Sequence, residues 1–538
     1  MEGDIRYFLK TAERLGDDIL KIQHEQASLL QSFNNLHSAT RSLPPFVLAE
    51  VFHYVCKDAP LYEDMLINYP AVQVISRVCS QWRQVAWTSP VLWTRVLLRF
   101  KAPGSWASNN SFAMLKLHSA NSGELALDIV LDIPDKYSSF CRRDEGSGWE
   151  RHYTTFTTIF YFIFIENPSR LGSLVLTRSG DMPKIWLELI QSYTTYPLAH
   201  NLSTNGYPNL TKLEFRPGNG MVASEWKEAD AHHLFKDTPV PRLASVSIQN
   251  REWLIRFPYR DLTALHLKYF PVNQCIDFLI NCPRLTSFYQ SSCMKPVPSE
   301  VKPPRNILDS PLVLSNLEDL EWSLGFRDWD VYLMTQFRFP SLSTLQIGHF
   351  ECPALWREPR STEADVDIYW APFLASLTKL KSISIDTELF TLASFELLWE
   401  PLSRLDQLGF LHITCEGNPA AAGQTKSIIG PLTLDTNPNP SQFTPLPHLT
   451  ALQIDMGHIK CLEGNAEPFL LLLESRAQSS QVPSIKSVDF RDHPYPTFGE
   501  ERPVWTTWSD EQRRRLVVLT EGGLKLILTQ ERMYWDND

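Results

Sequence analysis

The sequence lacks any long hydrophobic run, and its longest apolar stretch is the short segment Ile159–Ile165. A membrane-spanning helix needs about 20 apolar residues, so we expect no membrane association of that kind. The opening residues, Met1–Asp4, are acidic and no apolar signal core follows them, so we also expect no secretory leader.

The chain lacks a long basic run, and its 50 Lys and Arg against 61 Asp and Glu give a net charge of −11. Nucleic-acid binding depends on cationic groups that neutralise phosphates, so we expect no nucleic-acid partner. The 9 cysteines are scattered and never form a C-x-x-C pair, which indicates reduced thiols. These features predict a protein of the cytoplasm, the nucleus or both.

Motifs of catalysis are also missing, since no G-x-S-x-G, no H-E-x-x-H and no Cys/His cluster at zinc spacing occurs. The segment Gly218–Ala223 fits G-x-G-x-x-A, but Pro239 and Pro241 interrupt the region where the next strand of a dinucleotide fold would form. The pair Asp365 and Asp367 is too small to define a metal site by itself. We therefore expect no catalytic residue, no cofactor and no metal.

Glycine is scarce relative to proline, with 22 Gly against 38 Pro, which reverses the usual balance. Hydrophobic residues make up 43% and charged residues 21% of the chain, which is typical of a folded protein. The proline surplus indicates that proline recurs at regular structural positions.

Residues 4–38 are predicted to form one helix, because apolar residues alternate at spacings of three and four and no proline occurs before Pro44. Two interpretations stay open: a helix that lies on the following domain, or a coiled coil that gives a possible homodimer through residues 4–38. The apolar seam consists of Ile5, Phe8, Ala12, Leu15, Ile19, Ile22, Gln26, Leu29, Phe33 and Leu36.

A helical hairpin is predicted between Leu43 and Trp93, since apolar residues recur at helical spacing on both sides of the spacer 57–70. This apolar surface is larger than the core of a self-contained hairpin needs. Part of the surface should therefore face a partner. Its apolar positions are Val47, Leu48, Val51, Phe52 and Val55, then Val74, Val78, Cys79, Trp82 and Val85.

This segment resembles the F-box, the adaptor-binding module of Skp–cullin–F-box ubiquitin ligases. It departs from the family at Phe46, where an acid is usual, and in its longer spacer; a plain helical hairpin is the alternative. The matching motifs are Leu43-Pro44, Val47-Leu48, Val51-Phe52, Val78-Cys79, Trp82, Val85-Ala86 and Leu92-Trp93.

The resemblance implies that this hairpin binds a Skp-family adaptor and, through it, a cullin ligase. We expect Trp82 to be the main anchor, because buried aromatic side chains dominate interface energies. Some members of the set should instead fill the core of the hairpin. The residues expected to bind the adaptor are Leu43, Pro44, Val47, Leu48, Val51, Phe52, Val78, Cys79, Trp82 and Trp93.

From about residue 168 the pattern Leu-x-x-Leu-x-Leu/Ile/Phe recurs, often with a proline two residues before it. It resembles the strand segment of leucine-rich repeats, which implies parallel strands stacked into a solenoid. The intervals are irregular and the usual Asn/Cys is mostly missing, so an unrelated α/β domain stays an alternative. The leading residues are Leu171, Leu210, Leu243, Leu262, Leu285, Leu317, Leu342, Leu380, Leu408, Leu449 and Ile485.

We therefore predict an α/β protein with an N-terminal helix and a helical F-box, followed by an irregular leucine-rich-repeat-like solenoid with a parallel sheet. Further expected elements are a strand at Leu125–Ile133, a buried helix at Thr154–Ile165 and a helix at Asp510–Leu519 capped by Ser509. The predicted parts are an amphipathic or coiled-coil-like helix (1–40), the F-box (41–98), a connecting α/β segment (99–167) and the repeat-like domain (168–538).

An F-box followed by repeats resembles the non-catalytic substrate receptors of Skp–cullin–F-box ligases, which act in ubiquitin-dependent protein degradation. That resemblance implies a target protein, of unknown identity, bound by the repeat domain. The alternative is a coiled-coil and repeat scaffold that is not coupled to ubiquitination. Exposed strand positions expected to contact the target are Glu214, His266, Lys268, Glu321, Gln346, Asp386, His412, Asp455 and Arg491.

Overall fold

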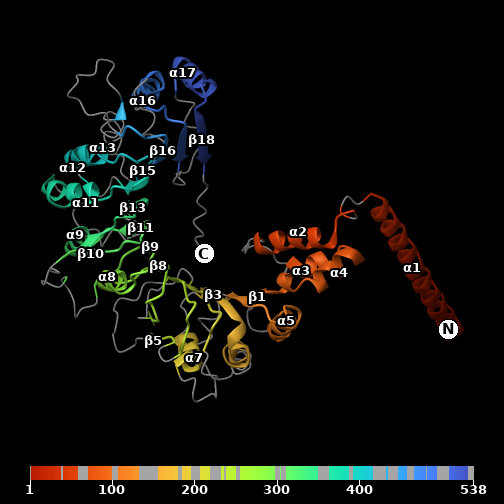
Figure 1. Cartoon of the computed structure of the whole chain (residues 1–538). Helices are drawn as coiled ribbons and strands as arrows, with labels where there is room; N and C mark the ends of the chain where they lie inside the picture. Colours follow the sequence, from red (N-terminus) through yellow and green to blue (C-terminus); the bar gives the residue numbers. More distant parts are fainter. Residues whose placement is uncertain are drawn as a thin grey trace. The chain divides into compact units, whose positions relative to one another are not determined.

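A computed structural model of the chain shows two compact units, residues 1–132 and 133–538 (Figure 1). The structure describes residues 2–37, 40, 42–58, 71–99, 107–132, 156–179, 184–195, 206–217, 232–235, 238–249, 255–296, 303, 310–348, 363–386, 390, 392–415, 432–433, 446–456, 466–479, 482–492 and 508–530. Among these residues, no helix is both long and apolar enough to cross a membrane.

The first unit contains a long helix, a helical hairpin and a pair of parallel strands. In chain order its elements are α1 (Glu2–His37), α2 (Pro45–Asp58), α3 (Ala71–Ser76), α4 (Ser80–Thr88), the 3-10 turn η1 (Pro90–Trp93), β1 (Arg95–Arg99), α5 (Ala107–Asn121) and β2 (Leu127–Asp132). The helix predicted over 4–38 is therefore confirmed, as is the strand predicted at Leu125–Ile133.

The apolar seam of α1 is exposed wherever its side chains are described. The exposed fraction is 53% at Leu15, 55% at Ile19, 64% at Ile22 and 72% at Leu29. Exposed seam residues leave a surface of the kind that a second helix covers in a coiled coil.

The hairpin has a core of its own that is shared among α2, α3, α4 and η1. Trp93 is fully buried at its centre, and its indole Nε1 donates to the Ala86 carbonyl oxygen at 2.8 Å. His118 of α5 packs edge-on against the same indole, so the compact unit continues beyond the hairpin to residue 132. The buried core residues are Leu48, Phe52, Val72, Ile75, Val85, Ala86, Leu92 and Trp93.

The second unit alternates strands with helical segments. Its helical segments are η3 (Phe162–Glu166), η4 (Pro168–Arg170), α7 (Lys184–Thr195), α8 (Val272–Asn281), α9 (Arg327–Gln336), α10 (Glu363–Asp365), η9 (Val366–Trp370), α11 (Ala371–Ala375), α12 (Leu392–Leu397), α13 (Trp399–Ser403), α16 (Ala466–Gln478) and α17 (Asp510–Glu521). The described part of the predicted segment Thr154–Ile165 is helical, and Ile159, Phe160 and Ile163 in it are buried.

The strands of this unit form a large parallel sheet in which spatial order follows chain order. The α/β class with a parallel sheet is thus confirmed. The sheet strands are β3 (Leu171–Ser179), β4 (Lys212–Pro217), β6 (Ser245–Gln249), β8 (Ala264–Lys268), β9 (Ser287–Ser291), β11 (Asp319–Ser323), β13 (Thr344–Gly348), β14 (Ser382–Asp386), β15 (Phe410–Cys415), β16 (Ala451–Met456), β17 (Ser487–Asp492) and β18 (Lys525–Gln530). Short pairs form beside it from β5 (His232–His233) with β7 (Ile255–Arg256) and from β10 (Leu312–Val313) with β12 (Phe337–Arg338).

The recurring leucine pattern marks the sheet strands from β3 to β17, whereas β18 was not among the predicted strands. Every predicted leading residue is buried, from Leu171 at 1% exposure to Ile485 at 5%. Within the strands, burial alternates: on β8, for example, Leu265 and Leu267 are buried while His266 is exposed. The helices lie along one side of the sheet (Figure 1), so the two sheet faces have different surroundings.

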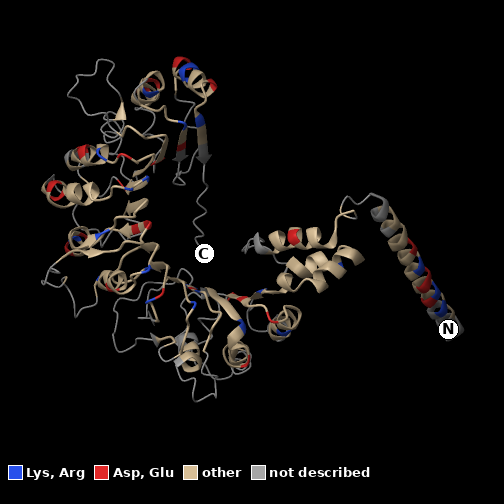
Figure 2. Ribbon diagram, in the orientation of Figure 1, with Lys and Arg blue, Asp and Glu red and all other residues tan. Residues whose placement is uncertain are grey.

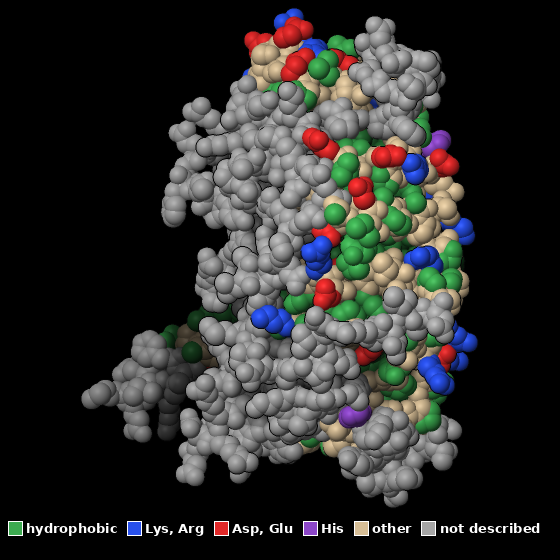
Figure 3. Space-filling model, turned by 90° about the vertical axis from the view of Figure 1, so that its left-hand side faces the viewer, with side chains coloured by type: hydrophobic (Ala, Val, Ile, Leu, Met, Phe, Trp, Pro, Cys, Tyr) green, Lys and Arg blue, Asp and Glu red, His purple; other side chains and the backbone are tan. Residues whose placement is uncertain are grey.

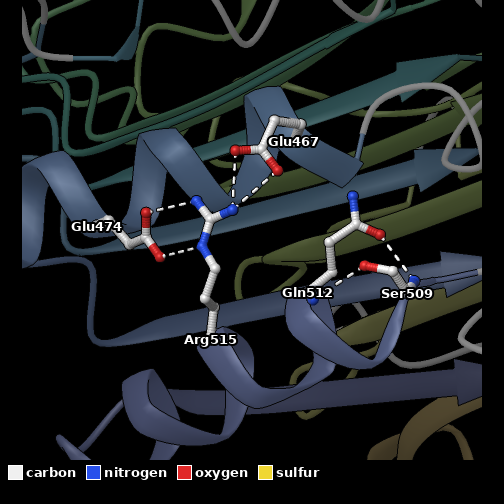
Figure 4. Close-up of polar contacts among 5 residues, drawn as sticks. All are labelled: Glu467, Glu474, Ser509, Gln512 and Arg515. Carbon is white, nitrogen blue, oxygen red and sulfur yellow. Dashed lines mark hydrogen bonds and ion pairs between the residues drawn. The ribbon is translucent and has the colours of Figure 1, made fainter.

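Helix α17 is held against α16 by one arginine. The guanidinium of Arg515 donates to both carboxylate oxygens of Glu474, at 2.7 and 2.6 Å, and to Glu467 at 2.8 Å (Figure 4). The expected helix cap is confirmed, because Ser509 and Gln512 form a reciprocal capping box. Across the helical side of this unit, acidic and basic side chains lie interspersed among hydrophobic ones (Figure 3).

Candidate functional site

Two surfaces carry the residues singled out by sequence: the helical hairpin of the first unit and the face of the parallel sheet that bears alternating polar residues. On the hairpin, α3 has no charged residue and α4 has a single arginine, Arg83. In Figure 2 these helices are largely uncharged, whereas α17 carries both signs. The hairpin is therefore suited to apolar contacts.

The structure divides the ten expected adaptor-binding residues into three groups. Leu48, Phe52 and Trp93 belong to the buried core. Leu43, Val47, Cys79 and Trp82 are half-buried, and Pro44, Val51 and Val78 are exposed. Neighbouring residues on a helix are about 100° apart, so Leu48 and Phe52 face the core while Val51 lies at the edge of the same apolar stripe.

Trp82 contributes to the packing of the hairpin itself. Its ring lies 4.7 Å, centroid to centroid, from that of Phe52, and its Nε1 donates to Thr40 Oγ1 at 3.3 Å. Its backbone N–H donates to Cys79 Sγ, which caps α4. Truncating Trp82 would therefore disturb the hairpin as well as any interface, which makes the exposed residues better probes of binding.

Several apolar side chains exposed on the hairpin lie outside the expected adaptor-binding set, although Val55 and Val74 were recognised as apolar positions of its helices. Phe46, at the position where the family usually has an acid, is 71% exposed, and α2 has no acidic residue in its first turn. The signal available in the sequence was their apolar character within or beside the predicted helices. These exposed residues are Phe46, Tyr54, Val55, Val74, Trp87 and Val91.

The Cys56 thiol of the hairpin is half-buried. Burial raises the pKa of Cys56 to about 11, and the charge of Arg95 opposes that rise. Arg95 also donates to the Cys56 carbonyl oxygen at 3.3 Å, joining the end of α2 to β1. This cysteine is therefore a neutral packing residue and not a reactive group.

On the sheet, strand register places the expected target-binding positions in two neighbouring rows. Glu214, His266, Glu321, Gln346 and His412 occupy one row of directly opposed positions. The other row, two residues further along the strands, contains Lys268, Asp386, Asp455 and Arg491. Since successive side chains alternate between faces, both rows lie on the same face.

The expectation that all these positions are exposed is wrong for Glu214, Asp386 and Asp455, which are 4%, 5% and 8% exposed. Neighbouring side chains in the parallel rows cover these short carboxylates, because strands lie only about 4.8 Å apart. His266 is exposed, Lys268, Glu321, Gln346 and His412 are half-buried, and the side chain of Arg491 lies outside the described residues.

Glu214 has its charge neutralised within its own strand. Its carboxylate accepts from Lys212 Nζ at 2.8 Å and from Arg216. Burial acts to raise the pKa of Glu214, but the hydrogen bonds and charges of these two cations hold it below the usual value. The Glu214 carboxylate is ionised and paired, so it adds no uncompensated charge to this face of the sheet.

A more connected polar group lies on β14, β15 and β16. Ser384 Oγ and His412 Nδ1 are 2.8 Å apart, and His412 Nε2 lies 2.8 Å from Asp455 Oδ2. Gln453 Nε2 donates to both oxygens of Asp455, at 3.2 and 3.4 Å. Sequence reasoning named His412 and Asp455 but missed Ser384 and Gln453, although both occupy the same repeat position as His412.

No cluster of metal-ligating residues occurs within the described ranges. Asp365 lies in α10 and forms an ion pair with Arg327, so this carboxylate has a structural partner. The glycine-containing segment Gly218–Ala223 falls outside the described residues.

Comparison with known proteins adds no relative: no protein-family model matches this chain, and no curated protein is significantly similar to it in sequence.

Proposed function

We propose that this chain is the substrate-recognition subunit of a Skp–cullin–F-box ubiquitin ligase. In this proposal the hairpin is an F-box that binds a Skp-family adaptor, and the second unit is an irregular leucine-rich-repeat-like solenoid that binds a target protein. The protein would act in the cytoplasm, the nucleus or both.

The observation that carries the proposal is the combination of a closed core and an exposed apolar surface on the same short helices. The eight buried residues complete the hairpin core. Val51, Val78 and Val74 nevertheless remain 47%, 57% and 48% exposed, in a segment with few charges. Full burial of one such side chain contributes about 1.5–3 kcal/mol, so several of them supply the driving force for an obligate protein partner.

The polar rows of the sheet support the second half of the proposal. Parallel strands in chain order give a continuous face on which side chains from distant segments lie in register. Such a face offers many hydrogen-bonding groups to a polar protein surface. A receptor of this kind accelerates ubiquitin transfer by raising the local concentration of target lysines, and it needs no catalytic residue for that transfer.

The test is co-purification of the full chain with a Skp-family adaptor. We expect a stoichiometric complex, and we expect Val51→Asp/Val78→Asp to abolish it because the two charges would have to be desolvated in the interface. Val518→Asp is the matched control, since Val518 is a 66% exposed valine of α17 in the other unit. A folded wild-type chain that forms no complex at micromolar concentration would refute the F-box proposal.

A scaffold that self-associates through α1 is the second candidate, favoured by the exposed seam of that helix. It requires a stable oligomer without the adaptor. Light scattering of the purified chain separates the candidates: a monomer that binds the adaptor favours the receptor, and an oligomer that does not bind it favours the scaffold.

A further inference from the structure

Ser384, His412 and Asp455 form an unbroken hydrogen-bonded chain across three adjacent parallel strands. Ser384 Oγ lies 2.8 Å from His412 Nδ1, and His412 Nε2 lies 2.8 Å from Asp455 Oδ2. A carboxylate only accepts hydrogen bonds, so this short contact assigns the imidazole proton to Nε2. The other nitrogen, Nδ1, then accepts from the serine hydroxyl.

The surrounding groups hold this arrangement in place. Gln453 Nε2 donates to both oxygens of Asp455 and so holds the carboxylate beside the ring. Its 3.2 Å contact with His412 Nε2 joins two donors in this tautomer and adds no hydrogen bond. Thr414 Oγ1 is 3.5 Å from the same ring nitrogen. The side chains of His412 and Asp455 are 19% and 11% exposed and Ser384 is 5% exposed, so these three residues are largely shielded from water.

We propose that Ser384 is an activated nucleophile that reacts with acyl and phosphonyl electrophiles, with His412 as its general base and Asp455 as the group that orients the base. This relation of hydroxyl, imidazole and carboxylate is the one by which nucleophilic serines are activated. The proposal goes beyond the receptor function and does not depend on it.

The step balances with groups that the chain supplies. Ser384 Oγ forms a bond to the electrophilic carbon or phosphorus, its proton passes to His412 Nδ1, and the leaving group departs with the bonding electron pair. Asp455 stabilises the imidazolium that results. Gln346 occupies the register position on the other side of Ser384, where its side-chain amide is the candidate donor to the developing oxyanion.

The sheet contains an internal comparison. Ser247 and His266 are also opposed on adjacent strands, but Ser247 Oγ and His266 Nδ1 are 3.5 Å apart. The next register position beyond His266 is Tyr289, whose ring packs edge-on against the imidazole. Ser247 therefore has a longer contact to its histidine. The carboxylate that acts electrostatically on His266, Glu214, is itself paired with Lys212 and Arg216, so we expect Ser247 not to react.

The experiment treats the intact full-length chain with a fluorescent fluorophosphonate and locates the label by peptide mass spectrometry. We expect a label on Ser384, formed as fluoride leaves phosphorus, that is lost in Ser384→Ala and kept in Ser247→Ala. His412→Asn should slow labelling by at least about 100-fold, which is the lower end of a general-base contribution.

Three results would overturn the proposal: no label on a folded wild-type chain, a label on a residue other than Ser384, or an unchanged labelling rate in His412→Asn. Asp455→Asn is the second variant, used if His412→Asn does not fold, and thermal melting followed by circular dichroism checks the fold of each. All variants should still bind the adaptor, so failure of this proposal and failure of the receptor proposal are distinguishable.

Discussion

Acidification should loosen the first unit, because His118 is a buried, neutral histidine in contact with the hairpin core. Its side chain is 1% exposed, and its Nδ1 donates to the Trp93 carbonyl oxygen at 3.0 Å. Nε2 is buried and has no hydrogen-bond partner among the residues that the structure describes. Protonation would therefore place a charged N–H in an apolar environment where no described group accepts from it.

The magnitude follows from the pKa. Burial lowers the pKa of His118 from 6.5 to about 4, and the hydrogen bond to Trp93 opposes that shift only in part. Between these pH values the unfolded chain binds a proton that the folded chain does not, so the free energy of unfolding falls as the pH falls. The full difference between the two pKa values corresponds to about 3 kcal/mol of unfolding free energy, which is lost progressively as the pH falls from 6.5 to about 4.

The assay is denaturant-dependent hydrogen exchange of peptides from α4 and η1, corrected for the intrinsic effect of pH on exchange. His118→Asn retains a donor near the Trp93 carbonyl and removes the titrating group. The opening free energy of this variant should therefore decrease less on acidification than that of the wild type. His24→Asn, on the exposed surface of α1, is the matched control. Equal pH dependence in the wild type and His118→Asn would refute the reasoning.

Other measurements test the remaining contacts. Arg515→Lys should lower the opening free energy of α17 by about 1–2 kcal/mol, because lysine lacks the paired donors to Glu474. The control Arg513→Lys should change that free energy by no more than about 0.5 kcal/mol. Equal effects of the two variants in hydrogen exchange would contradict this prediction. The Arg515 contribution should also vanish on acidification, because its hydrogen bonds lower the pKa of Glu474 and the stabilisation is lost as that carboxylate is protonated. Trp93→Ala should cost about 3–5 kcal/mol in denaturant unfolding of the first unit and abolish adaptor binding with it. Val78→Ala should leave unfolding nearly unchanged but raise the dissociation constant for the adaptor several-fold, and a variant that binds as wild type would place Val78 outside the interface.

The sequence located the sheet strands from β3 to β17, though not β18, because each of them follows from local chemistry. An apolar residue before the strand, alternation along it and a preceding proline all act within a few residues, and the positions from Leu210 to Ile485 are buried as this pattern requires. The same holds for α17, where Ser509 and the following residues contain a complete capping signal.

The sequence did not show which apolar residues of the hairpin form its core and which lie on its surface. Leu48 and Val51 are both apolar residues of one helix, and only the packing of α3, α4 and η1 around it decides that the first is 1% and the second 47% exposed. The same packing buries His118 against Trp93, a contact between residues that no motif connects.

Sequence alone determined where strands and helices form, since periodicity, proline and capping are properties of short segments. Only the tertiary structure decided which of their side chains meet. Ser384 and Asp455 come from segments far apart in the chain, and the parallel register of β14, β15 and β16 brings them to the two nitrogens of His412. Register depends on how whole strands pair across the sheet, and no local signal specifies a hydrogen bond between residues that distant in sequence.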